Sequence, residues 1–397
     1  MLMNSSGLLD QLHAHLAQWG LRSFSSDADY FAWQRATLSA ADLNRLNAQV
    51  ERKRSGDRQD EIAFYDLTAE PHILPVLYSQ RYEYFMEIGS RVLPRIGTAT
   101  TVLDYGCGVG VLTTFYARHC PEIQFVGVDR SPGSIAVAQS KATELGPTNV
   151  RFECHDVEVK ALCGSYDLII ATHALVQAEQ DSGMPSRDWT TFERARDEPR
   201  QAAFEQRTGI DVRLDRLSEV LSPGGHMIIF EKTRQLARRV PFQRALARRG
   251  LLLIESPEPI RYRLVEEVAD DGPFYVLQKG SARPLAWSEA PEPDEGLPFN
   301  QAMLRSAPHD SQDPDMPLYE NHWPSAQQAW ESLAGRLVQQ EETRRESDGR
   351  QLHVELGSAE GKAYLYCANT FDQRQLIVVE AARKALLDSY YREILSS

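Results

Sequence analysis

The segment from Thr101 to Gly110 constrains the fold more than any other part of the chain. It reads Thr-Val-Leu-Asp-Tyr-Gly-Cys-Gly-Val-Gly, so an apolar stretch containing Asp104 leads into glycines at positions 106, 108 and 110. Glycine adopts tight backbone turns that other residues resist, and it lets the backbone approach a ligand closely. A helix that starts after such a loop presents free amide groups. The segment therefore predicts a buried strand, a ligand-binding loop and a helix that begins near Val109.

The spacing of the three glycines distinguishes two kinds of nucleotide site. The dinucleotide fingerprint Gly-x-Gly-x-x-Gly would need a glycine at position 111. That position holds Val111, and Gly110 comes one residue early. A nicotinamide-dependent oxidoreductase is therefore a less favoured alternative, and an ordinary turn between a strand and a helix is another.

Apolar stretches alternate with helical patterns from about residue 98 to residue 280. This alternation predicts βαβ units and a doubly wound, seven-stranded, mostly parallel sheet of the α/β class. The last two strands have no clear crossover helix between them, so we expect an antiparallel hairpin there. The predicted strands are Thr101–Tyr105, Gln124–Asp129, Val150–Cys154, Asp167–Thr172, His226–Glu231, Leu251–Glu255 and Phe274–Gln278, with a helix at Pro241–Arg249 before the last two.

Residues 1–97 are predicted to form a helical N-terminal region that acts as a lid. Leucines at positions 8, 12 and 16 recur at helical spacing ahead of Trp19. Ser39–Asp42 resembles a capping box at the start of another helix. The charged run Glu51–Glu61 interrupts the pattern, and an aromatic stretch from Tyr78 to Phe85 leads through a further helix to residue 97.

Three other segments flank or interrupt the region at 98–280. Residues 176–207 are longer than an ordinary loop and rich in charge, which predicts an inserted lid. Residues 281–320 hold seven prolines among acidic residues, which predicts an extended linker. Residues 321–397 are predicted to form a small α+β domain. Its expected elements are a helix from Ser325 that includes Leu337, strands around Leu352–Leu356 and Tyr364–Tyr366, and a last helix that includes Ile394.

The motif at Asp104–Gly110 resembles the first motif of class I, Rossmann-like S-adenosylmethionine-dependent methyltransferases, an acid followed by x-Gly-x-Gly-x-Gly. The resemblance covers residues 98–280. It implies that Asp104, Gly106, Gly108 and Gly110 bind the cofactor, whose demethylated product is S-adenosylhomocysteine. It also implies that Asp129 binds both ribose hydroxyls, that Asp156 takes the adenine amino group with Val157 beside the ring, and that Thr172 and His173 end the strand facing the methyl group. A helix N-cap is the alternative role for Asp129 and Asp156.

His173 is the candidate catalytic residue, because an imidazole at the end of the fourth strand can act as a general base toward an acceptor. A packed structural histidine is the alternative. Tyr78, Arg81 and Tyr82 could instead close over the cofactor, since aromatic faces attract a sulfonium and an arginine pairs with a carboxylate. Helix packing is the alternative for these three residues.

The composition of the chain disfavours some classes of methyl acceptor. The net charge is -13 with a pI of about 5.3, whereas a nucleic-acid substrate favours a basic surface. Ala171–Ala174 stands where the exocyclic-amine methylases of nucleic acids have Asp/Asn-Pro-Pro-Tyr. Five scattered cysteines without paired spacing argue against a metal site and favour a reducing cytoplasm, and neither a targeting signal nor a membrane span is expected.

These observations predict a cytoplasmic methyltransferase for a small-molecule acceptor with oxygen, nitrogen or sulfur as the accepting atom. A protein or peptide methyltransferase and a non-catalytic regulatory protein that binds S-adenosylmethionine are the alternatives. The C-terminal domain is expected to cap the acceptor pocket or to mediate formation of a homodimer.

Overall fold

The computed structural model describes residues 5–54, 57–176, 181–281, 283–292, 298–304, 317–345 and 350–396. These residues form two compact units. The larger unit comprises residues 1–181, 202–234 and 242–287, and the smaller one comprises residues 182–201, 235–241 and 288–397. The predicted insertion and the predicted linker each contribute to both units, and residues 177–180, 282, 293–297 and 305–316 of these two segments lie outside the described residues.

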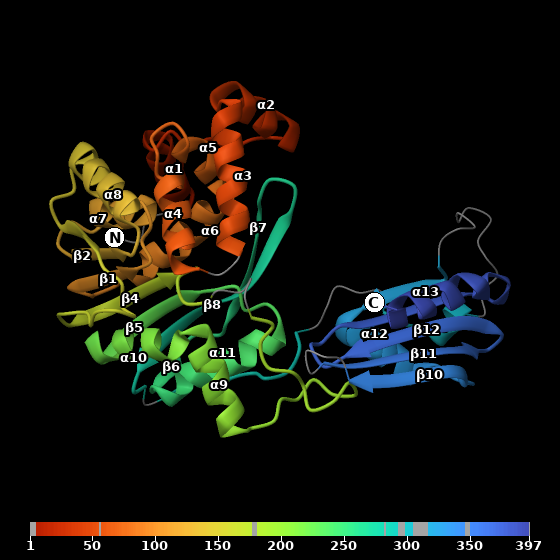
Figure 1. Cartoon of the computed structure of the whole chain (residues 1–397). Helices are drawn as coiled ribbons and strands as arrows, with labels where there is room; N and C mark the ends of the chain where they lie inside the picture. Colours follow the sequence, from red (N-terminus) through yellow and green to blue (C-terminus); the bar gives the residue numbers. More distant parts are fainter. Residues whose placement is uncertain are drawn as a thin grey trace. The chain divides into compact units, whose positions relative to one another are not determined.

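The larger unit is built on an eight-stranded sheet with the order β3-β2-β1-β4-β5-β8-β6, in which β7 pairs with β8 beside this path (Figure 1). Strands β1 to β5 are parallel to one another, whereas β8 is antiparallel to β5, β6 and β7. This arrangement confirms the predicted doubly wound fold and its antiparallel ending. The strands are β1 Thr101–Tyr105, β2 Gln124–Asp129, β3 Val150–Cys154, β4 Tyr166–Thr172, β5 Leu221–Phe230, β6 Leu251–Leu253, β7 Glu258–Arg263 and β8 Val268–Lys279.

Strand β7 and the first half of β8 were not predicted from the sequence. The expected strand began only at Phe274, because Gly272 and Pro273 precede it and such residues interrupt strands. The hairpin accommodates them through a register shift between Ile260 and Arg261. Gly272 has φ 135°, a conformation that side-chain-bearing residues rarely adopt. The hairpin therefore carries the sheet past residues that resemble a loop.

Five helices connect the strands or follow them. They are α7 Val111–His119, α8 Pro132–Leu145, α9 Glu198–Thr208, α10 Ile210–Val220 and α11 Leu236–Arg248. The expected start of the last helix at Pro241 is wrong, since α11 begins five residues earlier and contains Pro241 in its interior. Proline has no amide hydrogen for the carbonyl four residues before it. The amide of Met184 donates to that carbonyl, on Ala237, at 2.7 Å.

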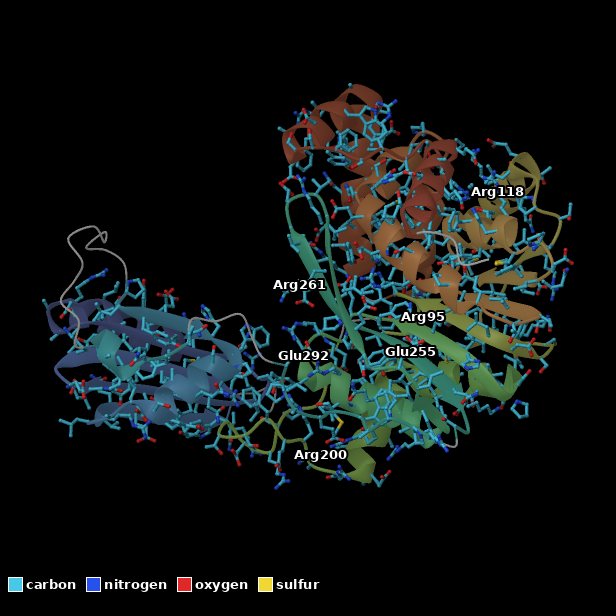
Figure 2. The ribbon with its side chains drawn as sticks, turned by 180° about the vertical axis from the view of Figure 1, so that it is seen from behind. Arg95, Arg118, Arg200, Glu255, Arg261 and Glu292 are labelled. Atoms are coloured by element: carbon cyan, nitrogen blue, oxygen red, sulfur yellow. The ribbon has the colours of Figure 1, made fainter. Side chains whose placement is uncertain are left out.

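The N-terminal helices share one hydrophobic core with the sheet. Leu12, Leu16 and Trp19 are buried in the same cluster as Val102 of β1 and Phe115 of α7. The ion pair between Arg95 and Glu255, at 2.9 Å, ties the end of the helical region to the segment after β6 (Figure 2). The helices are α1 Ser5–Gln18, α2 Asp27–Thr37, α3 Ala40–Arg54, α4 Arg58–Thr68, α5 Leu74–Ser79 and α6 Tyr82–Val92, with the short 3₁₀ helix η1 Leu93–Arg95.

The predicted capping box at the start of α3 is confirmed. The amide of Asp42 donates to the Ser39 hydroxyl at 3.1 Å, and the amide of Ser39 donates to the Asp42 carboxylate at 3.1 Å. Two amides that lack partners within the helix are satisfied in this way.

The smaller unit contains an antiparallel sheet of order β10-β11-β12-β13-β9. Alternate residues of these strands form two hydrophobic clusters, one including Ala326 of α12 and the other including Leu387 of α13, so each helix covers one face. The elements are η2 Gln301–Leu304, β9 Tyr319–His322, α12 Trp323–Ser332, β10 Leu337–Arg345, β11 Gln351–Ala359, β12 Lys362–Asn369, β13 Arg374–Glu380, η3 Ala381–Arg383 and α13 Lys384–Ser396.

The expected α+β content and the last helix are found, but the extension of the first helix to Leu337 is wrong. Helix α12 ends at Ser332, and Gly335, with φ 66°, turns the chain into β10. Leucines spaced four residues apart suit a helix, yet here Leu333 and Leu337 lie on either side of that turn. Within the described ranges, no helix is both long enough and apolar enough to cross a membrane.

Asn149, just before β3, links that strand to the end of α7 and to the segment between α7 and β2. Its buried side-chain amide donates to the carbonyls of Ala117, Cys120 and Ile123 at 2.7 to 3.1 Å. We expect Asn149→Ala to lower the free energy of unfolding by about 2 kcal/mol, because buried carbonyls lose their donor. Urea unfolding measures this change. Thr143→Ala, on exposed α8 surface, should change it by less than about 0.5 kcal/mol, and equal effects of the two variants would contradict the role given to Asn149.

Candidate functional site

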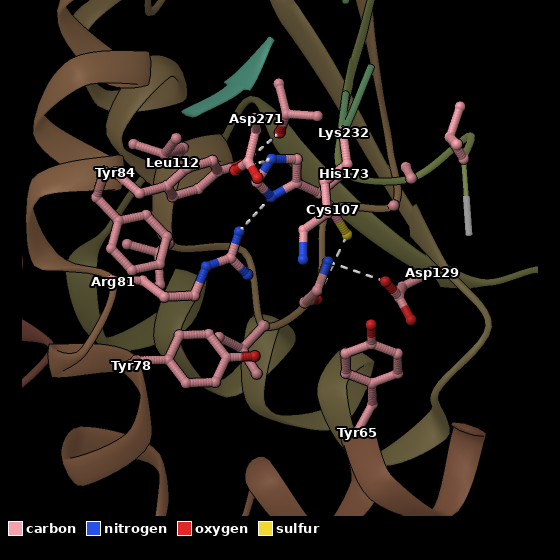
Figure 3. Close-up of a pocket in the computed structure, with 18 of the residues that line it drawn as sticks. Tyr65, Tyr78, Arg81, Tyr84, Cys107, Leu112, Asp129, His173, Lys232 and Asp271 are labelled. Carbon is pink, nitrogen blue, oxygen red and sulfur yellow. Dashed lines mark hydrogen bonds and ion pairs between the residues drawn. The ribbon is translucent and has the colours of Figure 1, made fainter. Parts of the chain in front are cut away.

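A cavity of about 650 Å³ opens at the carboxyl ends of the parallel strands. Strand β1 lies between β2 and β4, so the direction in which the sheet is built reverses there. Such a switch point is where doubly wound sheets bind ligands. The cavity walls come from the loops after β1, β2, β3 and β4, from the N-terminal helices and from β8 (Figure 3).

The three glycines of the loop after β1 have φ values of 73°, 55° and 82° at positions 106, 108 and 110. A Cβ on Gly106 would lie 2.4 Å from the Cβ of Ala174, and one on Gly110 would lie 2.8 Å from the ring of Phe152. Gly108 differs, since the nearest atom to its Cβ position is the Tyr78 hydroxyl at 3.8 Å. The outer glycines therefore allow close packing, and Gly108 opens the backbone to the cavity.

Helix α7 begins at Val111, two residues later than predicted, with Gly110 as its N-cap residue. Beneath the loop, buried Asp104 accepts a hydrogen bond from the Thr113 hydroxyl of this helix. Burial raises the pKa of Asp104 to about 6, although the bond from Thr113 opposes this shift. Asp104 thus fastens the strand end to the first turn of α7.

Asp129, at the end of β2, holds the glycine loop directly. One carboxylate oxygen accepts the amide of Gly108 at 3.0 Å, and the other accepts the amide of Ser131 at 2.9 Å. Burial raises the pKa of this carboxyl, and the two amides oppose the rise. The alternative N-cap role is wrong for Asp129, because Ser131 is the N-cap residue of α8.

Asp156 and Val157 form the cavity wall after β3. Asp156 makes an ion pair with Arg58 of α4, and its other oxygen accepts the amide of Glu158 at 2.9 Å. No helix follows Asp156 before β4, and all of those residues are described, so the N-cap alternative is wrong here too. Val157 is buried and presents an apolar surface. The ion pair with Arg58 was not anticipated.

His173 follows β4 with φ 54°, in the left-handed region. Its ring stacks between Tyr84 and Phe230, with centroid distances of 5.0 and 5.2 Å. Nδ1 lies 2.8 Å from a guanidinium nitrogen of Arg81, and Nε2 lies 3.1 Å from a carboxylate oxygen of Asp271 (Figure 3). Burial, followed by the charge of Arg81, lowers the pKa of His173 to about 4, against the opposing effect of Asp271.

The cavity wall formed by α5 and α6 only partly matches the prediction. Tyr78 and Arg81 line the cavity, as do Tyr84 and Phe85, which lie three and four residues after Arg81 on one helix face. Tyr82 points elsewhere, and its hydroxyl lies 2.7 Å from Nδ1 of His13 in α1. Thr172, at the end of β4, lines the cavity and accepts the Tyr84 hydroxyl at 2.9 Å.

Residues 96–284 match a family described as a methyltransferase domain. Together with the strand order, this match decides the identity of the larger unit's sheet. Residues 96–284 form a methyltransferase domain on a doubly wound sheet.

Relatives of the domain resemble it over limited stretches. A malonyl-[acyl-carrier protein] O-methyltransferase of Acetivibrio thermocellus is 37% identical over 70 residues, which is 18% of this chain and 24% of the relative. A release factor glutamine methyltransferase of Geobacter sulfurreducens is 31% identical over 152 residues, which is 36% of this chain and 49% of the relative. The chain thus spans a quarter to a half of these relatives. A solved magnesium protoporphyrin IX methyltransferase of Synechocystis is similar with a TM-score of 0.35 and 18% identity, covering 50% of this chain and 82% of that one.

Glu231 of the methyltransferase domain was not assigned a role from the sequence, although it directly follows β5. Its buried carboxylate accepts the amides of Ala174 and Leu175 at 2.7 Å and that of Val176 at 3.2 Å. An acid at the end of a predicted strand was the available signal. Asp271 and Tyr262 were missed with the β7–β8 hairpin that carries them.

The titration of Glu231 makes the free energy of unfolding depend on pH. Burial raises the pKa of Glu231 to about 7 despite the three amide bonds. Between pH 4.5, the ordinary pKa of a glutamate, and pH 7 the folded protein holds a proton that the unfolded chain has lost. The contribution of Glu231 to stability is therefore full below pH 4.5 and falls as the pH rises to 7.

We expect the free energy of unfolding of the parent, relative to Glu231→Gln, to fall by about 3 kcal/mol between pH 4 and pH 8. Glutamine stays neutral and keeps one acceptor for the loop amides. Urea unfolding of both proteins at each pH measures the difference. A difference independent of pH would show that Glu231 titrates normally in the fold.

Proposed function

We propose that the protein binds S-adenosylmethionine in this cavity and transfers its methyl group to a small-molecule acceptor. The observation that carries the proposal is the combination of Gly108, Asp129 and Arg81 on one cavity. Gly108 leaves the backbone open, Asp129 is a carboxylate acceptor, and Arg81 is a cation that makes no ion pair with a carboxylate among the described residues.

These groups fit the chemistry of the cofactor. A carboxylate oxygen can accept more than one hydrogen bond, so Asp129 can hold both the loop amides and the ribose hydroxyls. Val157 offers an apolar surface for the adenine ring, with Asp156 beside it for the amino group. Arg81 would pair with the methionine carboxylate. The cavity volume of about 650 Å³ lies within the usual range of small-molecule sites.

When bound, the cofactor supplies a methyl group on a sulfonium with a good leaving group. The chain's own contribution is then to position and to exclude water. The aromatic rings of Tyr78 and Tyr84 line the cavity and offer faces that attract a cation. Lys232 and Asp270 also line the cavity, near Asp271. In this proposal His173 closes the end of β4 beside the reacting groups.

The class of methyl acceptor is inferred from the size of the cavity and from the charge of the protein. A cavity of about 650 Å³ has the size of a small-molecule site, and a net charge of -13 disfavours a nucleic acid. The names of the relatives point to different acceptors. The relative from Acetivibrio thermocellus is named for a malonyl group on acyl-carrier protein, and the one from Geobacter sulfurreducens for a glutamine of a release factor. A third relative, from Photobacterium profundum, is named for a guanine of tRNA. A protein acceptor held by the smaller unit is therefore the second candidate, and a screen of both acceptor classes separates them.

We further propose a cellular compartment for the protein and a role for its N-terminal helices. All five cysteines are free thiols, which supports a reducing cytoplasm. We also propose that the N-terminal helices act as a lid, since Tyr65, Tyr78 and Arg81 come from them.

Asp129→Ala tests the cofactor site. We expect at least about tenfold weaker binding of S-adenosylhomocysteine, because both the ribose acceptor and the anchor of Gly108 are lost. Isothermal titration calorimetry of parent and variant measures it. Asp167→Ala is the matched control, because Asp167 binds Thr100 at the opposite end of the sheet, and it should retain parental affinity within about twofold. A parent that binds neither cofactor nor product would refute the proposed function.

A further inference from the structure

The guanidinium of Arg81 sits in the cavity wall with an unusual set of neighbours. It lies 4.2 Å over the ring of Tyr84, and it donates to Nδ1 of His173 at 2.8 Å. Among the described residues, His173 is the one hydrogen-bond acceptor of this side chain, and arginine carries five donors. A cation in this position is held by a neutral ring and keeps donors free for a ligand.

The contact with Arg81 determines the tautomer of His173. Arginine cannot accept a hydrogen bond, so Nδ1 must be the bare, accepting nitrogen. The proton of the neutral ring is then on Nε2, which lies 3.1 Å from Asp271. Asp271 also accepts the hydroxyl of Tyr262. These contacts lower the pKa of Asp271 to about 2, although burial alone would raise it.

Charges reach His173 from three elements. Arg81 precedes α6, Lys232 follows β5 and Asp271 belongs to β8, while the rings of Tyr84 and Phe230 cover the imidazole faces. The nitrogen that could accept a proton, Nδ1, is therefore occupied by Arg81, and Nε2 faces Asp271 at 3.1 Å without meeting hydrogen-bond geometry. A negative carboxylate, a neutral imidazole and a positive guanidinium form a line that ends in the cavity.

We infer that His173 and Asp271 are positioning residues that hold the Arg81 guanidinium toward the carboxylate of the cofactor. The inference rests on the proposed binding of S-adenosylmethionine. It replaces the general base expected for His173 with a role in cofactor affinity. The two roles differ in what they require of residue 173, since positioning needs an acceptor at Nδ1 and a base needs a titratable nitrogen.

Asparagine at position 173 separates these requirements. Asparagine tolerates positive φ better than most residues, and its side-chain oxygen is an acceptor on the γ carbon, close to the place of Nδ1. His173→Asn thus keeps a partner for Arg81 without a titratable group. His173→Ala removes the partner.

Two ligands are compared on the same protein sample, so that one affinity serves as the reference for the other. S-adenosylhomocysteine carries the amino-acid carboxylate, and 5′-methylthioadenosine has the same adenosine and sulfur without it. Calorimetric titration of both ligands gives a ratio of affinities that an unfolded fraction of the sample does not change. A variant that affects only the carboxylate contact changes the affinity for the first ligand alone.

We expect Arg81→Met to weaken S-adenosylhomocysteine about 30-fold, because a charge-assisted hydrogen bond is lost. His173→Ala should weaken it about fivefold, and His173→Asn should stay within about twofold of the parent. Binding of 5′-methylthioadenosine should change by less than about twofold in all three. If His173→Ala fails to fold, Asp271→Ala, which removes the carboxylate that lies 3.1 Å from Nε2, should give the same selective loss.

The outcomes separate the inference from the proposal on which it rests. If the parent binds neither ligand, the proposed function fails. If the parent binds both and His173→Ala or Asp271→Ala leaves the affinity ratio unchanged, the positioning role is overturned. An asparagine variant as weak as the alanine variant would overturn it as well.

Discussion

The loops after β1 and β4 approach each other so closely that the geometry of the site depends on their contact. A side chain at position 106 would collide with Ala174, so only glycine lets the two strand ends meet. The amide of Ala174 is in turn held by the buried carboxylate of Glu231. This pair of contacts sets where His173 begins its left-handed turn, and with it the position of Arg81. A cavity wall is thereby built from segments far apart in the sequence.

Much of the methyltransferase domain could be predicted because its signals are local. The apolar stretch and glycines at 101–110 and the strands ending at Asp129 and Cys154 appear where the sequence indicated them. Asp104, Asp129, Asp156 and Val157 line the cavity, and their binding of the cofactor stays a prediction. Such agreement arises because parallel strands buried on both faces are continuous apolar stretches bounded by turn residues.

The parts that were missed depend on tertiary contacts. Strand β7 and the start of β8 contain Pro259, Gly272 and Pro273, whose local preferences oppose a strand, and pairing between the two overrides them. Asp271 gains its importance only because this hairpin places it beside His173. The pairing of Asp156 with Arg58 joins residues 98 positions apart, which no local pattern could indicate. Long-range charge pairs of this kind follow from the fold and cannot be predicted from local sequence patterns.

We expect the cavity at the β1–β4 switch point to bind the methyl donor in one orientation. A structure determined with S-adenosylhomocysteine bound tests it most directly. We expect the ribose at Asp129, the adenine beside Val157 and the amino-acid carboxylate within hydrogen-bond distance of the Arg81 guanidinium. Ligand density at another site, or in this cavity with the carboxylate directed away from Arg81, would contradict it.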